Sequence, residues 1–277
     1  MSSDAELLEA NKNAVVENPF TVLIALNRDA QPAVGEIAAK LRELFPNLQP
    51  VRDIVEEDTG FGFTLNGSII VFLRVPGPIP LDPSMEDPTI NKPLTAATLN
   101  AQRAYLVIVV REREPIQAAI AATEVTAAVA DCCPYAIAIY WPAARQFVAP
   151  QVFVEQAVKQ VHSHPPIDLW IDVRVWQLDD KQHHAAYTRG LRALGHKEFE
   201  VRRSPESAKD LRGRLEGLCS YVLSNGPIIH DGHTVGHDAD ERISILLCRS
   251  IHGLQELVLR LDYDEDFRPR RPWWKLI

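Results

Sequence analysis

Apolar residues recur with two different periods in the first part of the chain. Between residues 34 and 44 they fall at helical spacing on one face, which predicts an amphipathic helix. Between residues 61 and 65 they alternate with other residues, which predicts a strand, and the Asn66-Gly67 pair that follows is typical of a hairpin turn. The apolar runs at 69–75 and 105–110 predict further strands, the second buried on both faces.

The predicted elements follow one another in an order that recurs. Up to residue 110 they run β-α-β-β-α-β, and the same order is expected between residues 105 and 176. This is the order of the ferredoxin-like split unit. We therefore expect an α+β fold in which two tandem ferredoxin-like pseudo-repeats, about 20–110 and 105–176, form a mixed or antiparallel sheet covered by helices.

The rest of the chain is expected to complete one compact domain. Residues 177–277 predict a C-terminal α/β extension, with a long helix from Pro205 to Leu223 followed by two antiparallel strands. Residues 1–18 are polar and end at an Asn-Pro pair, which predicts a loosely ordered leader. The single domain is then expected to span residues 19–277.

Composition indicates a folded protein of the cytoplasm. Hydrophobic residues make up 46% and charged residues 24% of the 277 residues, which are proportions typical of globular proteins. The longest apolar runs fall far short of the roughly 20 residues that cross a bilayer. The first residues are acidic, unlike a secretory signal, and the four cysteines lack the spacing of a disulfide framework. We expect reduced thiols and a cytoplasmic location.

Charge favours a protein partner over nucleic acid. The net charge of −8 disfavours direct binding to a phosphate backbone and favours basic partners. Acidic residues also cluster, and such clusters form either a solvated rim or a surface complementary to a basic protein, with nearby aromatic residues as anchors. The candidate partner-binding residues are Glu56, Glu57, Asp58, Asp82, Glu86, Asp87, Asp262, Asp264, Glu265, Asp266, Trp273 and Trp274.

Histidine is the one residue type dense enough to suggest catalysis. The tightest cluster runs from His230 to His237, but its spacing along a strand does not direct three ligands to one metal ion. The sequence also lacks His-Glu-x-x-His, Cys-x-x-Cys, phosphate-loop and Gly-x-Ser-x-Gly motifs. We expect no catalytic residue, no cofactor and no metal. The alternative is a metal-dependent or small-ligand enzyme that uses this loop with Asp231 and Glu198.

Four short motifs carry a resemblance to a known family. They are Val75-Pro76-Gly77-Pro78-Ile79-Pro80, Ala138-Ile139-Tyr140-Trp141, Thr188-x-Gly190-Leu191-x-x-Leu194-Gly195-x-x-Glu198-x-Glu200, and Asp231-Gly232-x-Thr234-x-Gly236. From about Phe20 to Tyr263 the layout resembles the bacterial family named domain of unknown function 4261. The resemblance implies one compact bacterial domain and no catalytic role. Leu81 departs from that pattern, which usually has Trp soon after the Pro-Ile-Pro run.

These observations favour a non-enzymatic bacterial binding protein. The leading hypothesis is an immunity-type inhibitor that neutralises a basic toxin, such as a nuclease effector of a type VI or contact-dependent secretion system. It predicts a protein partner, no direct contact with nucleic acid and no membrane association. Besides the enzyme, a second alternative is a secretion adaptor or chaperone that uses the proline-rich segment 76–93 as its contact loop.

Overall fold

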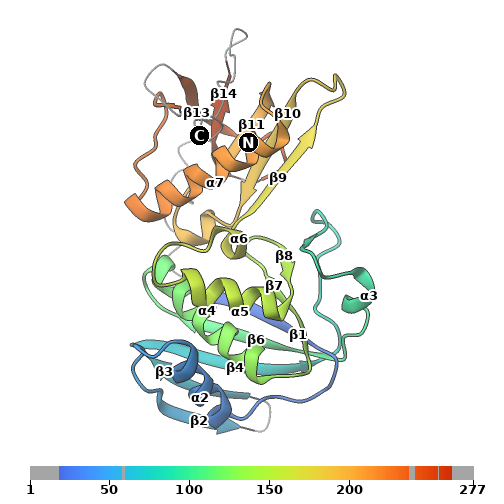
Figure 1. The fold of residues 1–277 in the computed structure, drawn as a ribbon, viewed down its shortest axis with the longest axis vertical. Helices are drawn as coiled ribbons and strands as arrows, with labels where there is room; N and C mark the ends of the chain where they lie inside the picture. The colour runs from blue at the N-terminus through green and yellow to red at the C-terminus, as the bar shows by residue number, and fades with distance from the viewer. Residues whose placement is uncertain (1–18, 58–59, 237–240, 255, 264–277) are drawn as a thin grey trace, which may run out of the picture. The chain divides into compact units, whose positions relative to one another are not determined.

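The structure is a computed structural model that describes residues 19–57, 60–236, 241–254 and 256–263 (Figure 1). Contacts within the chain divide it into two compact units, one of residues 15–172 and one of residues 173–277 with 1–14. They are named here the N-terminal unit and the C-terminal unit. That residues 19–277 form a single domain stays a prediction.

The N-terminal unit contains an eight-stranded sheet with the order β2-β3-β4-β6-β1-β7-β8-β5. Neighbouring strands pair antiparallel except β5 and β8, which are parallel. The predicted hairpin turn lies between β3 and β4, where Asn66 and Gly67 both have positive φ. The strands are β1 (Phe20–Leu26), β2 (Arg52–Glu57), β3 (Gly60–Leu65), β4 (Ser68–Pro76), β5 (Thr89–Ile90), β6 (Ala104–Arg111), β7 (Ala136–Trp141) and β8 (Gln146–Val148).

Helix α4 (Pro115–Cys132) is the centre of the helical layer of this unit. It packs on β1 and β6 and on the helices α2 (Val34–Leu44) and α5 (Pro150–Gln160). Alanines dominate its buried positions, and their small side chains allow the helix to lie close to the sheet. Because α4 is apolar nearly all round, it can only be stable when buried. Two short helices, α3 (Ala96–Leu99) and α6 (Ile167–Trp170), complete the unit.

Alternating residues of the central strands fill the core beneath these helices. The strand register aligns Phe61, Phe72, Ile108 and Val22 across β3, β4, β6 and β1, so their side chains share one face. All four are buried, and the rings of Phe61 and Phe72 stack with centroids 4.2 Å apart.

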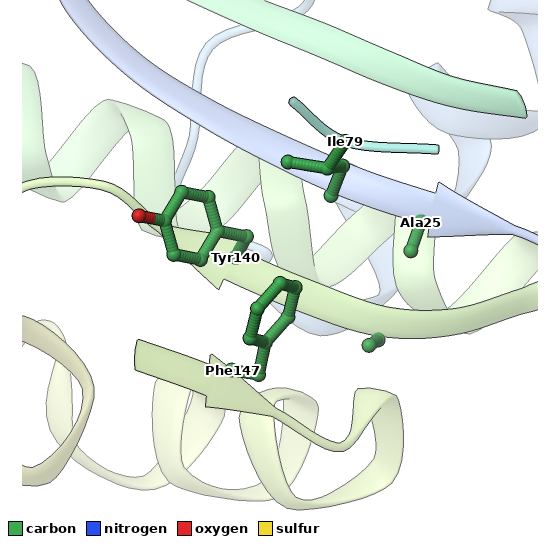
Figure 2. Close-up of a cluster of buried hydrophobic side chains, with 5 residues drawn as sticks. Ala25, Ile79, Tyr140 and Phe147 are labelled. Atoms are coloured by element: carbon green, nitrogen blue, oxygen red, sulfur yellow. The ribbon is translucent and has the colours of Figure 1, made fainter. Parts of the chain in front are cut away.

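The proline-rich segment covers part of the opposite face of the sheet. Ile79, only 6% exposed, packs in a cluster with Tyr140 and Phe147 of β7 and β8 (Figure 2). Arg145 holds the segment at Glu86, since its Nε and Nη2 donate to the carbonyl oxygen of Glu86 at 3.1 and 2.6 Å. The proline-rich segment therefore includes a buried residue, Ile79, that completes the core.

Glu124 is a buried carboxylate on the otherwise largely apolar helix α4. Its side chain is 3% exposed, and Oε1 lies 3.2 Å from Nε2 of the half-exposed His162. The ring of His162 in turn meets Phe45 edge-on, with centroids 5.6 Å apart. Burial raises the pKa of Glu124 to about 7, because the ionised form has lost its hydration.

The C-terminal unit contains a six-stranded sheet with the order β12-β13-β14-β11-β10-β9. Strands β11 and β14 are parallel, and β13 and β14 form the predicted antiparallel pair. The predicted long helix is confirmed as α7 (Ala208–Asn225), which begins at the capping residue Ser207 and ends before Gly226. The remaining elements are β9 (Asp172–Gln177), β10 (His184–Arg189), β11 (Phe199–Ser204), β12 (Thr234–Val235), β13 (Ile243–Arg249), β14 (Leu257–Asp262) and the 3₁₀ helix η1 (Arg192–Leu194).

The α+β class is confirmed, with two separate mixed sheets, whereas the tandem ferredoxin-like repeats are not confirmed. The last strand expected in the second repeat, residues 169–176, is placed differently. Leu169 and Trp170 belong to α6, and β9 pairs with β10 in the sheet of the C-terminal unit. The second helix expected before residue 110 is the short α3. Among the described residues, none of the helices is long and apolar enough to cross a membrane.

We expect Ile79→Ala to destabilise the N-terminal unit by about 2–4 kcal/mol, because it removes a buried anchor of the proline-rich segment. The exposed Leu81 of the same segment supplies the control, and Leu81→Ala should cost less than about 1 kcal/mol. Urea unfolding followed by circular dichroism measures both. Equal, small effects would show that the segment does not hold to the sheet.

The buried carboxyl of Glu124 should make stability depend on pH. Its folded pKa of about 7 lies above the value of about 4.3 expected in the unfolded chain. Stability from the bound proton is therefore complete below the lower value and is lost as the pH rises through the higher one. The wild type should lose up to about 3 kcal/mol relative to Glu124→Gln between pH 4 and pH 8.

Two further variants control this measurement. Glu155→Gln changes an exposed carboxyl of α5 and should follow the wild type at every pH. His162→Gln keeps the buried carboxyl and separates the contribution of the facing imidazole. A constant difference between the wild type and Glu124→Gln across the pH range would contradict the argument.

Candidate functional site

An exposed apolar groove runs along β3 on the sheet face opposite the helices. The register places Val55 of β2 opposite Gly62, and Gly62 opposite Val71 of β4. Since β3 contributes Gly60 and Gly62 to the floor, side chains of β2 and β4 rise on either side of an open channel of about 380 Å³. The lining residues are Asp53, Val55, Glu57, residues 60–64 and residues 69–73.

Glycine is required at position 60 of this floor because β3 and β4 approach closely there. A Cβ atom at Gly60 would lie 2.2 Å from the carbonyl oxygen of Phe72, which is a steric clash. At Gly62 it would lie 3.0 Å from the carbonyl oxygen of Ile70. The groove is therefore built into the backbone of the hairpin.

The groove lies where the cover of the proline-rich segment ends. One row of paired residues crosses the sheet from Tyr140 through Leu23 and Val107 to Leu73. Tyr140 is 5% exposed, Leu23 and Val107 are partly exposed, and Leu73 is 44% exposed. On β2, Val55 is 58% exposed. An apolar surface of this kind commonly marks a binding site.

The charged residues that line the groove are both acidic. Glu57 is paired with Gly60 of the floor. Asp53 lies where the register of β2 shifts between Arg52 and Val55, and its φ is +52°. Glu56 is paired with Phe61, whose side chain lies in the core on the helix side, so Glu56 faces away from the groove. The adjacent glutamates thus belong to opposite faces of the sheet.

The other predicted partner-binding residues are not gathered around this groove. Asp82, Glu86 and Asp87 belong to the segment that leads to β5, at the sheet edge opposite β2. Asp262 is the last residue of β14 in the C-terminal unit. For all of these, a role in binding stays a prediction. Asp58, Asp264, Glu265, Asp266, Trp273 and Trp274 lie outside the described residues.

The histidine loop does not bring metal ligands together in the described part of the chain. The rings of His230 and His233 meet edge-on with centroids 5.4 Å apart. No group of three or more His, Cys, Asp or Glu residues that could hold a metal ion occurs among the residues described, which exclude His237. Asp231 instead accepts a hydrogen bond from the backbone N–H of Leu247 at 2.7 Å, which ties the loop to β13.

Glu198 holds the turn between β10 and η1. Its Oε1 accepts from the backbone N–H groups of Gly190 and Arg192 at 2.8 and 3.0 Å, and its Oε2 accepts from the hydroxyl of Thr188 at 2.8 Å. That hydroxyl oxygen accepts in turn from the N–H of Phe199. Burial raises the pKa of Glu198, while these hydrogen bonds oppose the shift. The motif from Thr188 to Glu198 is therefore a structural network.

A buried ion-pair cluster anchors α7 to the loops around it. Arg214 donates through Nε to Glu206 at 2.8 Å, and through Nη1 and Nη2 to both oxygens of Glu241 at 3.2 and 2.9 Å. The hydroxyl of Tyr263 also donates to Glu206, at 3.0 Å. The three charges are paired with one another, and this pairing offsets the cost of burying them.

Sequence reasoning missed the groove, although β3 carried a signal for it. Gly60 and Gly62 alternate with Phe61 and Phe63, so the strand has one bulky face and one bare face. Glycine alternating with large apolar residues in a predicted strand is the pattern that indicates a channel.

The hydrogen bonds of Glu198 predict different stabilities for two variants of this residue. We expect Glu198→Ala to destabilise the C-terminal unit by about 3 kcal/mol or more, because it leaves buried donors unpaired. Glu198→Gln keeps one oxygen for both N–H groups and should cost less than about 1 kcal/mol. Denaturant unfolding of both variants measures the difference, and equal costs would contradict this account.

Residues 187–275 match the family model described as Domain of unknown function (DUF4261). No curated protein matches the chain. The match includes the Thr188 to Glu200 and Asp231 to Gly236 motifs, whereas the motifs at 75–80 and 138–141 lie outside it. The resemblance expected from about Phe20 is therefore supported over the C-terminal unit. Residues 187–275 of this chain are therefore similar to the family named domain of unknown function 4261.

Proposed function

We propose that this protein is a non-enzymatic bacterial binding protein that neutralises a basic toxin, as an immunity-type inhibitor does. The observation that carries the proposal is the exposed apolar groove over β2, β3 and β4, whose lining charges are the carboxylates of Asp53 and Glu57. Apolar contacts supply affinity at such a surface, and complementary charge selects the partner and speeds encounter.

The overall charge supports a basic partner. A net charge of −8 attracts a cationic protein over a distance of several ångströms before contact is made. Toxins that cleave nucleic acids carry clustered Lys and Arg for the phosphate backbone, so a nuclease effector of a type VI or contact-dependent secretion system fits the proposal. In this proposal the inhibitor acts in the cytoplasm, where such a toxin would reach its substrate.

The proposal predicts a toxin that this chain can be shown to neutralise. Affinity purification from the bacterium that encodes the chain should recover a basic protein that arrests growth when expressed alone. Co-expression of the chain should restore growth, and the association rate of the purified pair should fall about ten-fold or more from low to high salt.

Two controls make the result specific. An unrelated acidic protein of similar net charge should fail to restore growth, because general electrostatic attraction lacks the apolar contact. If the recovered basic proteins are harmless, or if co-expression leaves growth arrested, the proposed function is wrong.

A further inference from the structure

The groove has a shape and a charge pattern that restrict what can occupy it. Its floor is the backbone of Gly60 and Gly62, and its apolar wall on β4 is formed by Ile69, Val71 and Leu73. The wall on β2 combines Val55 with the two carboxylates. An occupant therefore meets an apolar channel with anionic groups along one side.

We infer that this groove binds a short extended peptide segment in which a large apolar side chain is flanked by lysine or arginine. The inference rests on the proposed function, since it identifies the part of the basic partner that the groove would take. The apolar side chain enters the channel over the glycine floor, and the cationic groups pair with Asp53 and Glu57.

The apolar side chain is required by what the channel exposes. Val55 and Leu73 are 58% and 44% exposed, and no polar side chain stands between them, because the residue paired with each on β3 is glycine. A branched or aromatic side chain in such a channel displaces water from both walls at once. Anchors of this kind carry most of the binding energy in protein interfaces.

The spacing of the carboxylates sets the spacing of the cationic residues. Asp53 and Glu57 are four positions apart on β2, and the bulge between Arg52 and Val55 shortens their separation along the strand. At about 3.3 Å per residue this corresponds to roughly 10–13 Å. An extended ligand matches that distance with cationic residues three or four positions apart and the apolar residue between them.

Charge disfavours a second copy of the chain as the occupant. Two copies meeting through this groove would bring Asp53 and Glu57 of one copy against the same carboxylates of the other. The β2 strand as a whole carries three carboxylates and one guanidinium group, so edge pairing of two copies also brings together an excess of like charge. Like charges at an interface are strongly unfavourable.

Three synthetic peptides test the inference on the full chain. The first has the sequence Lys-Thr-Leu-Thr-Lys, the second replaces both lysines with glutamate, and the third replaces leucine with serine. Binding is measured from the methyl resonances of Val55, Val71 and Leu73 in nuclear magnetic resonance titrations. The first peptide should shift these resonances, and the other two should bind about ten-fold or more weakly.

Neighbouring residues on β2 provide a matched pair of variants. Glu57→Lys should weaken binding of the first peptide about ten-fold or more, because it places a cation on the wall of the groove. Glu56→Lys makes the same change in net charge on the opposite face and should change binding less than about two-fold. Leu73→Ser should abolish binding, whereas Val158→Ser, on the exposed side of α5, should not.

Several results would overturn the inference. These are absent shifts with the first peptide, equal binding of the glutamate peptide, or equal loss in Glu56→Lys and Glu57→Lys. Self-association that Leu73→Ser removes would identify a second copy as the occupant instead.

If a toxin is neutralised equally well by the Glu57→Lys and Leu73→Ser variants as by the wild type, the proposed function stands and this site is wrong. If the peptide binds but no toxin is found, the proposed function fails and the site stands.

Discussion

The close packing of α4 on β1 and β6 is the constraint on which the rest of the N-terminal unit depends. Alanines let the helix approach the sheet, and α2 and α5 pack beside it in the same layer. This arrangement supplies helices to one face of an eight-stranded sheet, so the other face needs a different cover. The proline-rich segment supplies that cover over β1, β7 and β8 through Ile79. Over β3 and β4 the apolar surface stays exposed, and the groove is the direct consequence.

The C-terminal unit uses buried carboxylates to organise its loops. Glu198 accepts from the N–H of Gly190 in the turn before η1 at 2.8 Å, and Glu200 accepts from the N–H of Ile251 at 3.2 Å. A buried carboxylate is costly unless its oxygens accept several hydrogen bonds, and backbone N–H groups of turns are equally costly when left unpaired. Each of these hydrogen bonds lowers the cost of burying the carboxylate and also satisfies a backbone N–H group of a turn. The Thr188 to Glu200 motif, which lies within the match to the family model, is thus largely explained by the fold itself.

Local pattern predicted individual elements well and their pairing poorly. The helix at 34–44, the hairpin at Asn66 and Gly67, and the long helix α7 all follow from spacing or capping within a few residues. The partner of β9 is not a local property, because a strand of that composition can join either of two sheets. For the same reason the sequence indicates no more than a contact loop for the proline-rich segment. Its prolines exclude a helix, although Thr89 and Ile90 form the short strand β5. The burial of Ile79 depends on a cluster of buried residues more than 40 positions away in either direction.

The adjacent residues Glu56 and Glu57 show why an acidic run in a sequence is an incomplete description of a binding surface. Both are exposed, but their pairing with Phe61 and Gly60 sends them to opposite faces, so one of the two charges lies beside the apolar channel. Asp53 lines the same groove and lies two positions before Val55 and four before Glu57 on β2. Charge that steers a partner from a distance depends on the whole cluster, whereas charge that selects a partner on contact depends on the register. Strand register therefore determines which of the clustered carboxylates can contribute to specificity, and the composition of the cluster does not.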